Sequence, residues 1–144
     1  RGVVIHNVSV VAPTWSPNTD GIEPMNSTDV RVTSCFVHNG DDCVTVKGGC
    51  RNVLVADNYF SSGHGATIGS VTDQNVDSVI FRHILLNATT NAFQIKGHAD
   101  SKPAAVSNIL YENIRFVNLT QFHDMHHDPA MAVHIDMNWG GGPR

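Results

Sequence analysis

A short alternation of polar and apolar residues recurs along the chain and sets the strongest limit on its fold. Its five copies are Asn7-Val8-Ser9-Val10, Asp29-Val30-Arg31-Val32, Asn52-Val53-Leu54-Val55, Ser78-Val79-Ile80-Phe81 and Asn108-Ile109-Leu110-Tyr111. Their first apolar positions are residues 8, 30, 53, 79 and 109, so the intervals grow from 22 to 30 residues. A period of two is that of a β-strand, and strands repeated at this spacing are typical of a solenoid. The sequence therefore predicts an all-β fold, a parallel β-helix.

Three polar clusters follow a similar spacing. They are Asn18-Thr19-Asp20-Gly21, Gly40-Asp41-Asp42-Cys43 and Gly63-His64-Gly65. Asp20 precedes Asp41 by 21 residues, and Asp42 precedes His64 by 22 residues. Strands of neighbouring coils lie about 4.7 to 4.9 Å apart. We therefore expect these side chains to stack in one column beside one groove.

The size and composition of the chain fit one elongated core. It has 144 residues, of which 41% are hydrophobic, and this is enough for one core but hardly for two. Arg1 already lies in a predicted strand, and no initiating Met precedes it. We expect residues 1–144 to be the central coils of a single β-helix catalytic domain, with N- and C-terminal coils missing from the sequence.

The distribution of charge argues against two classes of partner. The net charge is −4 and the nine Lys and Arg residues are scattered, so we expect no binding to nucleic acid or to an anionic membrane. No apolar run has the length of a transmembrane span. Sequons for N-glycosylation begin at Asn7, Asn26, Asn87 and Asn118 and favour secretion. The expected protein is a secreted monomer, extracellular or in a cell wall.

The polar clusters indicate chemistry only in combination. A single Asp beside Gly is most often a turn residue, and a single His is most often structural. Three carboxylates held close together cannot all stay ionised at low cost, so at least one should have a raised pKa. A protonated carboxyl beside ionised ones supplies the acid and the base that glycoside hydrolysis requires. Asp20, Asp41, Asp42 and His64 are therefore the candidate catalytic residues.

These motifs closely resemble those of the polygalacturonase family, glycoside hydrolase family 28. The resemblance rests on the three clusters, on Ile68-Gly69-Ser70 and on Gln94-Ile95-Lys96, and it extends to Ile135-Asp136. It implies a right-handed parallel β-helix that acts on pectic polysaccharide. The implied reaction cleaves α-1,4-galacturonosyl or related bonds by single displacement with inversion, without a metal or other cofactor.

The resemblance also assigns roles to single residues. It makes Asp41 the general acid, and it makes Asp20 and Asp42 the pair that activates the attacking water. His64 matches the supporting histidine of the family. Lys96 matches the lysine that binds the substrate carboxylate.

The expected substrate-binding residues depart in part from the family pattern. Asn18 and Gln94 complete this set, but the family usually has Arg where this chain has Gln94, and many endo-acting members have Tyr where it has Met131. Arg can donate two parallel hydrogen bonds to a carboxylate, whereas Gln is neutral and shorter. We expect intact hydrolytic machinery with an altered subsite that tolerates an esterified, neutral or otherwise modified sugar.

Other functions remain open at the level of the sequence. One is a pectate lyase on the same kind of solenoid, although that chemistry needs a calcium site and a basic residue that abstracts a sugar proton. Another is a carbohydrate-binding β-helix that turns nothing over. Endo and exo action cannot be distinguished, because cleft closure depends on loops and coils outside the sequence.

The cysteines and one His-rich run suggest less. Cys35 lies in a strand pattern and is predicted to be buried. Cys43 and Cys50 flank a short loop and could pair, or one could bridge to a missing segment. A run of polar residues lacks structural-zinc spacing and is predicted to be a solvated loop: His123, Asp124, His126, His127 and Asp128. Trp139 could offer a sugar a stacking face, but it is rather expected to pack or to lie at an exposed end.

Overall fold

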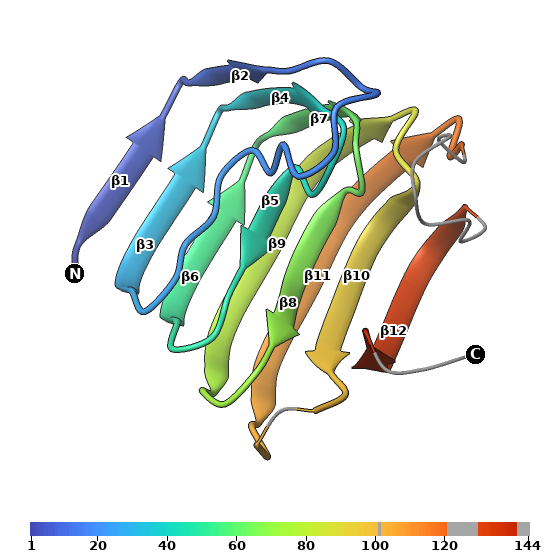
Figure 1. Cartoon of the computed structure of the whole chain (residues 1–144). Coiled ribbons are helices and arrows are strands. Elements are labelled where there is room, and N and C mark those ends of the chain that lie inside the picture. Colours follow the sequence, from blue (N-terminus) through green and yellow to red (C-terminus); the bar gives the residue numbers. More distant parts are fainter. Residues whose placement is uncertain (101, 121–129, 141–144) are drawn as a thin grey trace.

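The structure is a computed structural model that describes residues 1–100, 102–120 and 130–140. Within these ranges every helix-or-strand element is a β-strand (Figure 1). The strands are β1 (Val3–His6), β2 (Ser9–Val11), β3 (Thr28–Thr33), β4 (Phe36–Asn39), β5 (Val44–Val46), β6 (Arg51–Ala56), β7 (Tyr59–Ser62), β8 (Ala66–Val71), β9 (Val76–Asn87), β10 (Asn91–His98), β11 (Val106–Val117) and β12 (Met131–Trp139). The predicted all-β class is confirmed.

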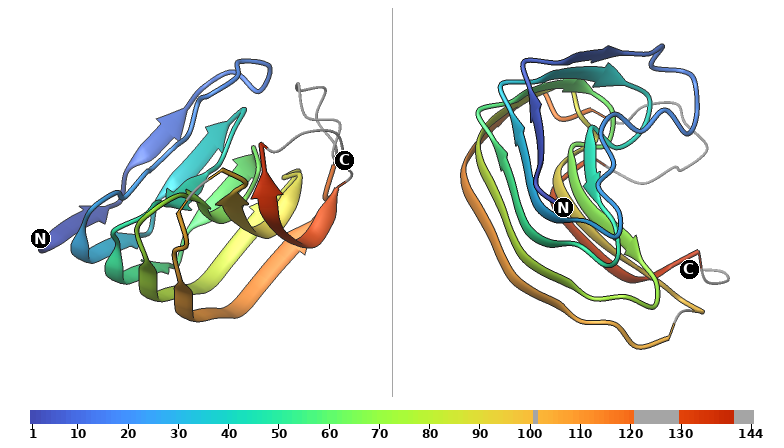
Figure 2. Two further views of the ribbon diagram at one scale, coloured as in Figure 1. Left: turned by 60° about the horizontal axis from the view of Figure 1, so that its bottom comes forward. Right: turned by 90° about the vertical axis from the view of Figure 1, so that its left-hand side faces the viewer.

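The strands form two parallel sheets that the chain enters in turn on each coil. The larger sheet has the order β1-β3-β6-β9-β7-β4-β2, with β11 beside β9, and the smaller sheet has the order β12-β10-β8-β5. Figure 2 shows the coils stacked along one axis. This arrangement is the predicted parallel β-helix. The part of the chain that the structure describes contains no helix long and apolar enough to cross a membrane.

The register of the larger sheet follows the sequence repeat, with one correction. Successive copies pair across the coils: Val30 with Val53, Val53 with Val79 and Val79 with Ile109. On the first coil the partner of Val30 is Val3, not Val8 as the alternation predicts. The long connection between β2 and β3 lengthens this coil, so the interval measured from Val8 does not give the register.

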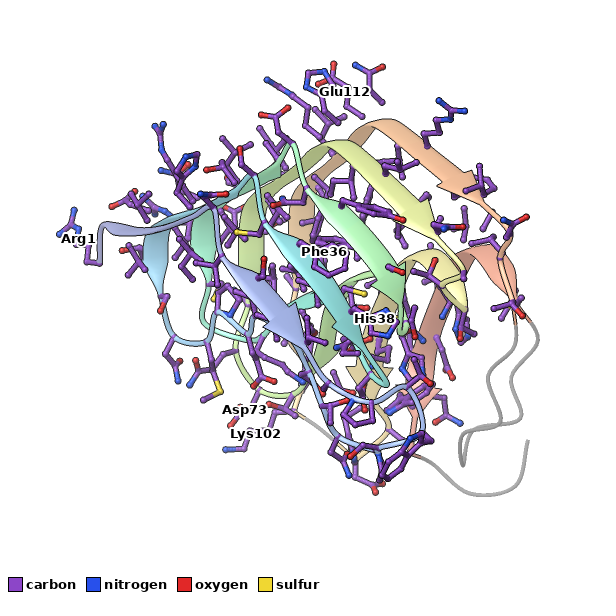
Figure 3. The ribbon with its side chains drawn as sticks, turned by 90° about the horizontal axis from the view of Figure 1, so that it is seen from above. Arg1, Phe36, His38, Asp73, Lys102 and Glu112 are labelled. Carbon is purple, nitrogen blue, oxygen red and sulfur yellow. The ribbon has the colours of Figure 1, made fainter. Side chains whose placement is uncertain are left out.

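Alternate residues of each strand fill the interior of the solenoid. On β4, Val37 is fully buried, whereas its neighbours Phe36 and His38 are partly exposed (Figure 3). This is the alternation that a strand imposes, because successive side chains point to opposite faces. Burial of the apolar rows is the main favourable contribution to folding.

An aromatic stack joins the larger sheet to the smaller sheet. The ring of Tyr111 on β11 lies 4.7 Å from that of Phe81 on β9 and 4.2 Å from that of Phe93 on β10. The Tyr111 hydroxyl also donates a hydrogen bond to the backbone oxygen of Ala66 at 3.4 Å. These contacts position β8 and β10 of the smaller sheet relative to the larger sheet.

The cysteines are all buried free thiols. The burial predicted for Cys35 is confirmed, but a bond between Cys43 and Cys50 is not formed. The Cys43 thiol instead donates to the backbone oxygen of Ser62 at 3.1 Å, and burial raises its pKa. Both residues belong to the apolar core, because a protonated thiol behaves as a small hydrophobic group.

Candidate active site

Three of the expected catalytic residues lie at one level on consecutive coils, just before the smaller sheet. The register there is set by two pairs, Ile22 with Val44 and Val44 with Ala66. Asp20, Asp42 and His64 each lie two residues before a member of this row, so they form the expected column. The sequence spacing matches Asp20 with Asp41, whereas the register matches it with Asp42.

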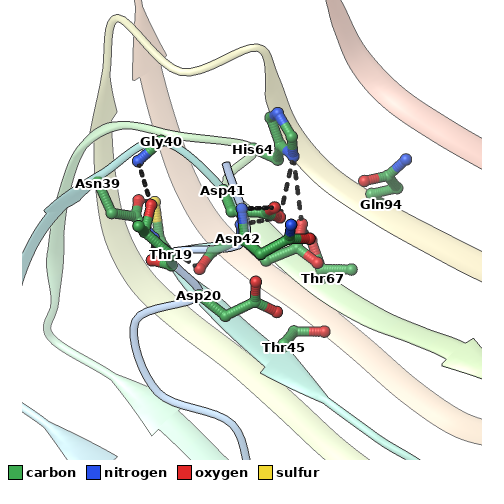
Figure 4. Close-up of polar contacts among 12 residues, drawn as sticks. Thr19, Asp20, Asn39, Gly40, Asp41, Asp42, Thr45, His64, Thr67 and Gln94 are labelled. Atoms are coloured by element: carbon green, nitrogen blue, oxygen red, sulfur yellow. Dashed lines mark hydrogen bonds and ion pairs between the residues drawn. The ribbon is translucent and has the colours of Figure 1, made fainter. Parts of the chain in front are cut away.

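Hydrogen bonds between coils hold the turns that carry these side chains. The buried Asn39 amide donates to the backbone oxygens of Thr19 at 2.7 Å and of Asp42 at 2.9 Å. The backbone N–H of His64 donates to the backbone oxygen of Asp41 at 2.9 Å. One amide therefore links the first cluster to the second, and the backbone links the second to the third (Figure 4).

The third cluster requires its two glycines for a backbone reason. Gly63 has a φ of 74° and Gly65 has a φ of 84°, a region that residues with a Cβ rarely adopt. A Cβ at Gly63 would overlap the backbone oxygen of Asp41, and a Cβ at Gly65 would overlap that of Asn91. The glycines let this turn pack directly on the turns of the neighbouring coils.

The polar clusters open onto one small cleft of about 170 Å³. It is lined by Asn18, Asp20, Asp41, Asp42, Lys47, His64, Ser70, Lys96 and Trp139. The structure thus brings together all the residues expected to catalyse the reaction or to bind substrate, except Gln94. The Gln94 side chain is not part of the lining, and the residue is only 2% exposed.

Asp42 is the most deeply buried carboxylate of the cleft, with a relative exposure of 1%. Lys96 Nζ donates to its Oδ2 at 2.9 Å, and Thr67 Oγ1 donates to its Oδ1 at 2.7 Å. A buried carboxylate needs such partners, because burying an unpaired charge costs several kcal/mol, on the order of 5. Lys96 therefore balances the charge of Asp42 in the free site, and its ammonium also lies 4.8 Å from the centre of the Trp139 ring.

Asp41 is held in its ionised form. Burial pushes its pKa upward, but the contact with His64, the backbone N–H of Asp42 and the charge of Lys96 together lower the pKa to about 2. His64 Nδ1 lies 3.3 Å from Asp41 Oδ1, and the Asp42 N–H donates to the same oxygen at 2.7 Å. The N–H of Asn18 donates to Asp41 Oδ2 at 3.2 Å. Both oxygens of this carboxylate are thus engaged.

Asp20 is the carboxyl with a raised pKa. Burial and the negative charges of Asp41 and Asp42 raise its pKa to about 7, and the charge of Lys47 opposes this only in part. Lys47 Nζ lies 3.9 Å from Asp20 Oδ2 and 3.6 Å from a carboxylate oxygen of Glu23. The sequence predicts a raised pKa among the three acids, and the structure assigns it to Asp20.

Several side chains at the cleft were missed by the sequence analysis. Lys47 continues the alternation of β5, in which the core residues Val44 and Val46 are fully buried, so this pattern could have identified it. Trp139 lies at the end of β12, and the sequence gives no signal that its ring would meet Lys96. His134 was also missed; its Nδ1 lies 2.8 Å from the Gln94 amide nitrogen.

A metal ion could in principle be held by part of the cleft. One ligand atom each from Asp41, Asp42 and His64 lie within 4.8 Å of one another. The expectation of a reaction without a metal therefore stays a prediction. The run from His123 to Asp128 lies outside the described residues.

Another, larger hollow lies elsewhere in the described structure. It has a volume of about 620 Å³ and is formed by β3, β6, β9, β11 and residues beside them in the larger sheet. Asp29 is the one carboxylate among its lining residues, so it offers no acid and base pair. The smaller cleft, by contrast, is lined by three aspartates.

Comparison with known proteins identifies the family. The model of glycosyl hydrolases family 28 matches residues 1–123. A polygalacturonase of Medicago sativa is 33% identical over 83% of this chain and 30% of its own length. An exopolygalacturonase of Zea mays is 33% identical over 96% of this chain and 33% of its own length. The chain thus spans about a third of the length of these relatives.

A solved structure extends the comparison to the fold. The polygalacturonase from Erwinia carotovora ssp. carotovora matches 94% of this chain and 49% of its own chain, with a TM-score of 0.62 and 23% identity. At this identity the match shows a shared β-helix and nothing finer. Together with the family match over residues 1–123, it leads to one conclusion. The chain belongs to glycosyl hydrolases family 28.

Proposed function

We propose that the protein containing this chain hydrolyses pectic polysaccharide, cleaving α-1,4-galacturonosyl or related bonds with inversion. The observation that carries the proposal is the cleft in which Asp20, Asp41 and Asp42 meet His64 and Lys96. The names of the relatives, polygalacturonase and exopolygalacturonase, support the substrate class. We propose a secreted monomer of the extracellular space or cell wall that uses no metal or other cofactor.

Asp20 and Asp42 are proposed to activate the attacking water. Asp42 accepts hydrogen bonds from Lys96 and Thr67, which fix the position of its carboxyl group in the buried site. The raised pKa of Asp20 makes its ionised form a stronger base than an ordinary carboxylate. One proton leaves the water toward this pair while the water oxygen attacks the anomeric carbon, which gives single displacement with inversion.

The general acid is proposed to be Asp41 acting together with His64. Asp41 by itself has no proton to donate in the free site, because its pKa is about 2. His64 lies 3.3 Å from it and can supply a proton through this contact. In the proposed step a protonated His64 first transfers its proton to Asp41, and the neutral Asp41 carboxyl then protonates the departing glycosidic oxygen, so the pair rather than one carboxyl is the acid.

Substrate recognition is proposed to centre on Lys96, with Asn18 at the cleft and with the buried Gln94 two residues before Lys96 on β10. Lys96 lines the cleft and has a point charge that a galacturonate carboxylate can meet. Asn18 also lines the cleft. Gln94 is neutral at the position where the family usually has Arg, so we propose weaker binding of a charged sugar at that subsite and better tolerance of an esterified one.

The test is product analysis with the full-length protein on de-esterified and methyl-esterified pectic glycans. Release of reducing ends, with the newly formed anomer inverted by NMR, is the expected result. The Asp42→Asn variant, checked for its fold by circular dichroism, is the matched control and should lose turnover by about two orders of magnitude or more.

Two other outcomes would contradict the proposal. An unsaturated product formed without water consumption would identify a pectate-lyase-type reaction. Binding of the glycan with no release of reducing ends would identify a non-catalytic carbohydrate-binding β-helix.

A further inference from the structure

Two buried polar side chains on the last two strands of the smaller sheet form a pair beside the cleft. Gln94 on β10 is paired in register with His134 on β12, and the two residues are 2% and 9% exposed. Gln94 Nε2 lies 2.8 Å from His134 Nδ1. An amide nitrogen can only donate, so Nδ1 accepts and the ring carries its proton on Nε2. The bond thereby fixes both the tautomer and the orientation of the imidazole.

The oriented imidazole contacts the aromatic wall of the cleft. The His134 ring meets the Trp139 ring edge-on, with the centroids 6.3 Å apart and the planes at 69°. Trp139 lines the cleft and lies beneath the Lys96 ammonium at 4.8 Å. Lys96 in turn donates to Asp42. A continuous series of contacts therefore runs from Gln94 through His134 and Trp139 to the cation of the site.

We propose that His134, held by Gln94, is a positioning residue that fixes Trp139 and thereby the Lys96 ammonium for recognition of a sugar carboxylate. The inference rests on the proposed hydrolysis of pectic glycans. An ammonium over an indole face is held by a cation–π interaction, provided that the ring keeps its place. Gln94 lies two residues before Lys96 on β10 and has no charge, so Lys96 is the permanent cation that this strand presents to the cleft.

The chain offers substitutions that separate the two contacts of His134. In His134→Asn the amide oxygen can replace Nδ1 as the acceptor for Gln94, but the ring against Trp139 is lost. In His134→Phe the ring is kept and the acceptor is lost. His6→Asn is the control, because His6 Nδ1 also bonds a neighbouring coil, at 3.0 Å from Thr33 Oγ1, but on β1 of the other sheet.

The experiment measures kcat and KM of the full-length variants on oligogalacturonides before and after methyl esterification. We expect His134→Asn to raise KM for the de-esterified substrate about three- to tenfold, with kcat changed by less than about twofold and little effect on the esterified substrate. His134→Phe should raise KM less than His134→Asn does. In a Trp139→Leu background, His134→Asn should add less than a factor of about two, because its effect passes through Trp139.

Each alternative result has a definite meaning. Equal loss on both substrates, or full additivity with Trp139→Leu, would overturn the role of His134 and leave the hydrolase proposal standing. If His134→Asn does not fold, the same substrate difference is required of Trp139→Leu, and its absence overturns the inference. If the wild-type protein hydrolyses nothing, the proposed function fails, and the same variants are then compared by the Kd for trigalacturonate, where an unchanged Kd overturns the positioning role.

Discussion

At the scale of single residues, the site is governed by where its protons lie. Asp20 has a raised pKa because it is buried beside two negative charges, whereas His64 and the charge of Lys96 keep Asp41 ionised. The three carboxylates are identical aspartate side chains, so only the groups around each of them make their pKa values differ. Predictions about acid, base and substrate binding all follow from these neighbours.

The acid and the base can be separated by the leaving group of the substrate. Asp41→Asn should lower turnover on pectic glycan by about 10² to 10⁴, and a substrate with an aryl leaving group of low pKa should recover most of it, because such a group departs without protonation. Asp42→Asn should lose turnover on both substrates, since water activation is still needed. Equal recovery in both variants, measured by initial rates, would reject the assignment of acid and base.

The raised pKa of Asp20 predicts a dependence of stability on pH. The folded state keeps this proton up to about pH 7, whereas the unfolded state releases it near the ordinary aspartate pKa of 3.8, so the free energy of unfolding falls as pH rises between the two. Asp20→Asn removes this loss. Its Tm relative to the wild type should therefore be higher at about pH 8 than at about pH 3.

Asp77 is a matched control of opposite sign. Hydrogen bonds from Asn108, Ser107 and Ser78 lower its pKa, so its contribution to stability is present above the unfolded pKa and is lost as pH falls through the folded pKa. Asp77→Asn should thus lose more Tm at about pH 8 than at about pH 3. A difference of the same sign in both variants would contradict the linkage argument.

Gln94 should influence which pectic substrate is accepted. Gln94→Arg would add a second cation beside Lys96, and its guanidinium can still donate to His134 Nδ1. Charge-assisted hydrogen bonds contribute about 1.5 to 3 kcal/mol against about 1 for neutral ones, so kcat/KM on de-esterified relative to esterified substrate should rise about tenfold. Gln94→Met adds no charge and also removes the hydrogen bond to His134, so it should not raise this ratio. An unchanged ratio in Gln94→Arg would mean that this position does not read the carboxylate.

At the scale of the elements, strands and tight turns share the work of building the site. Pairing of β5, β8, β10 and β12 fixes the distance between coils. The turn before β5 presents Asp41 and Asp42, and the turn before β8 presents His64. Those turns have little regular structure of their own, so backbone contacts between coils define them. The glycines of the third cluster are where this dependence is strongest.

Gly65→Ala tests the role of that turn. A residue with a Cβ at a φ of 84° costs about 1 to 2 kcal/mol, and overlap with the backbone oxygen of Asn91 adds to it. Gly2→Ala is the control, because its φ is 71° but a Cβ there would meet nothing within 4 Å. Urea unfolding should show a larger loss of stability for Gly65→Ala. Equal losses would mean that φ alone, rather than packing between coils, requires glycine.

At the scale of the whole molecule, the sequence predicted the class of fold and six of the nine residues that line the cleft. Both predictions rest on local patterns. The alternation of polar and apolar residues indicates the strands, and the spacing of the polar clusters indicates which side chains lie on neighbouring coils. The tertiary structure alone decided that Val3 rather than Val8 pairs with Val30, that Asp20 is level with Asp42, and that Cys43 stays a free thiol.

Long-range contacts explain why these details could not be predicted from the sequence. The lengths of the loops between strands decide which residues meet on adjacent coils. The pKa of a group depends on its burial and on all the charges around it. Sequence spacing therefore predicts neither the register nor the pKa. The position of the proton on Asp20 and the series from Gln94 through His134 to Trp139 are of this kind. Gln94 and His134 are 40 residues apart in the sequence, and only the parallel pairing of β10 with β12 brings them into contact.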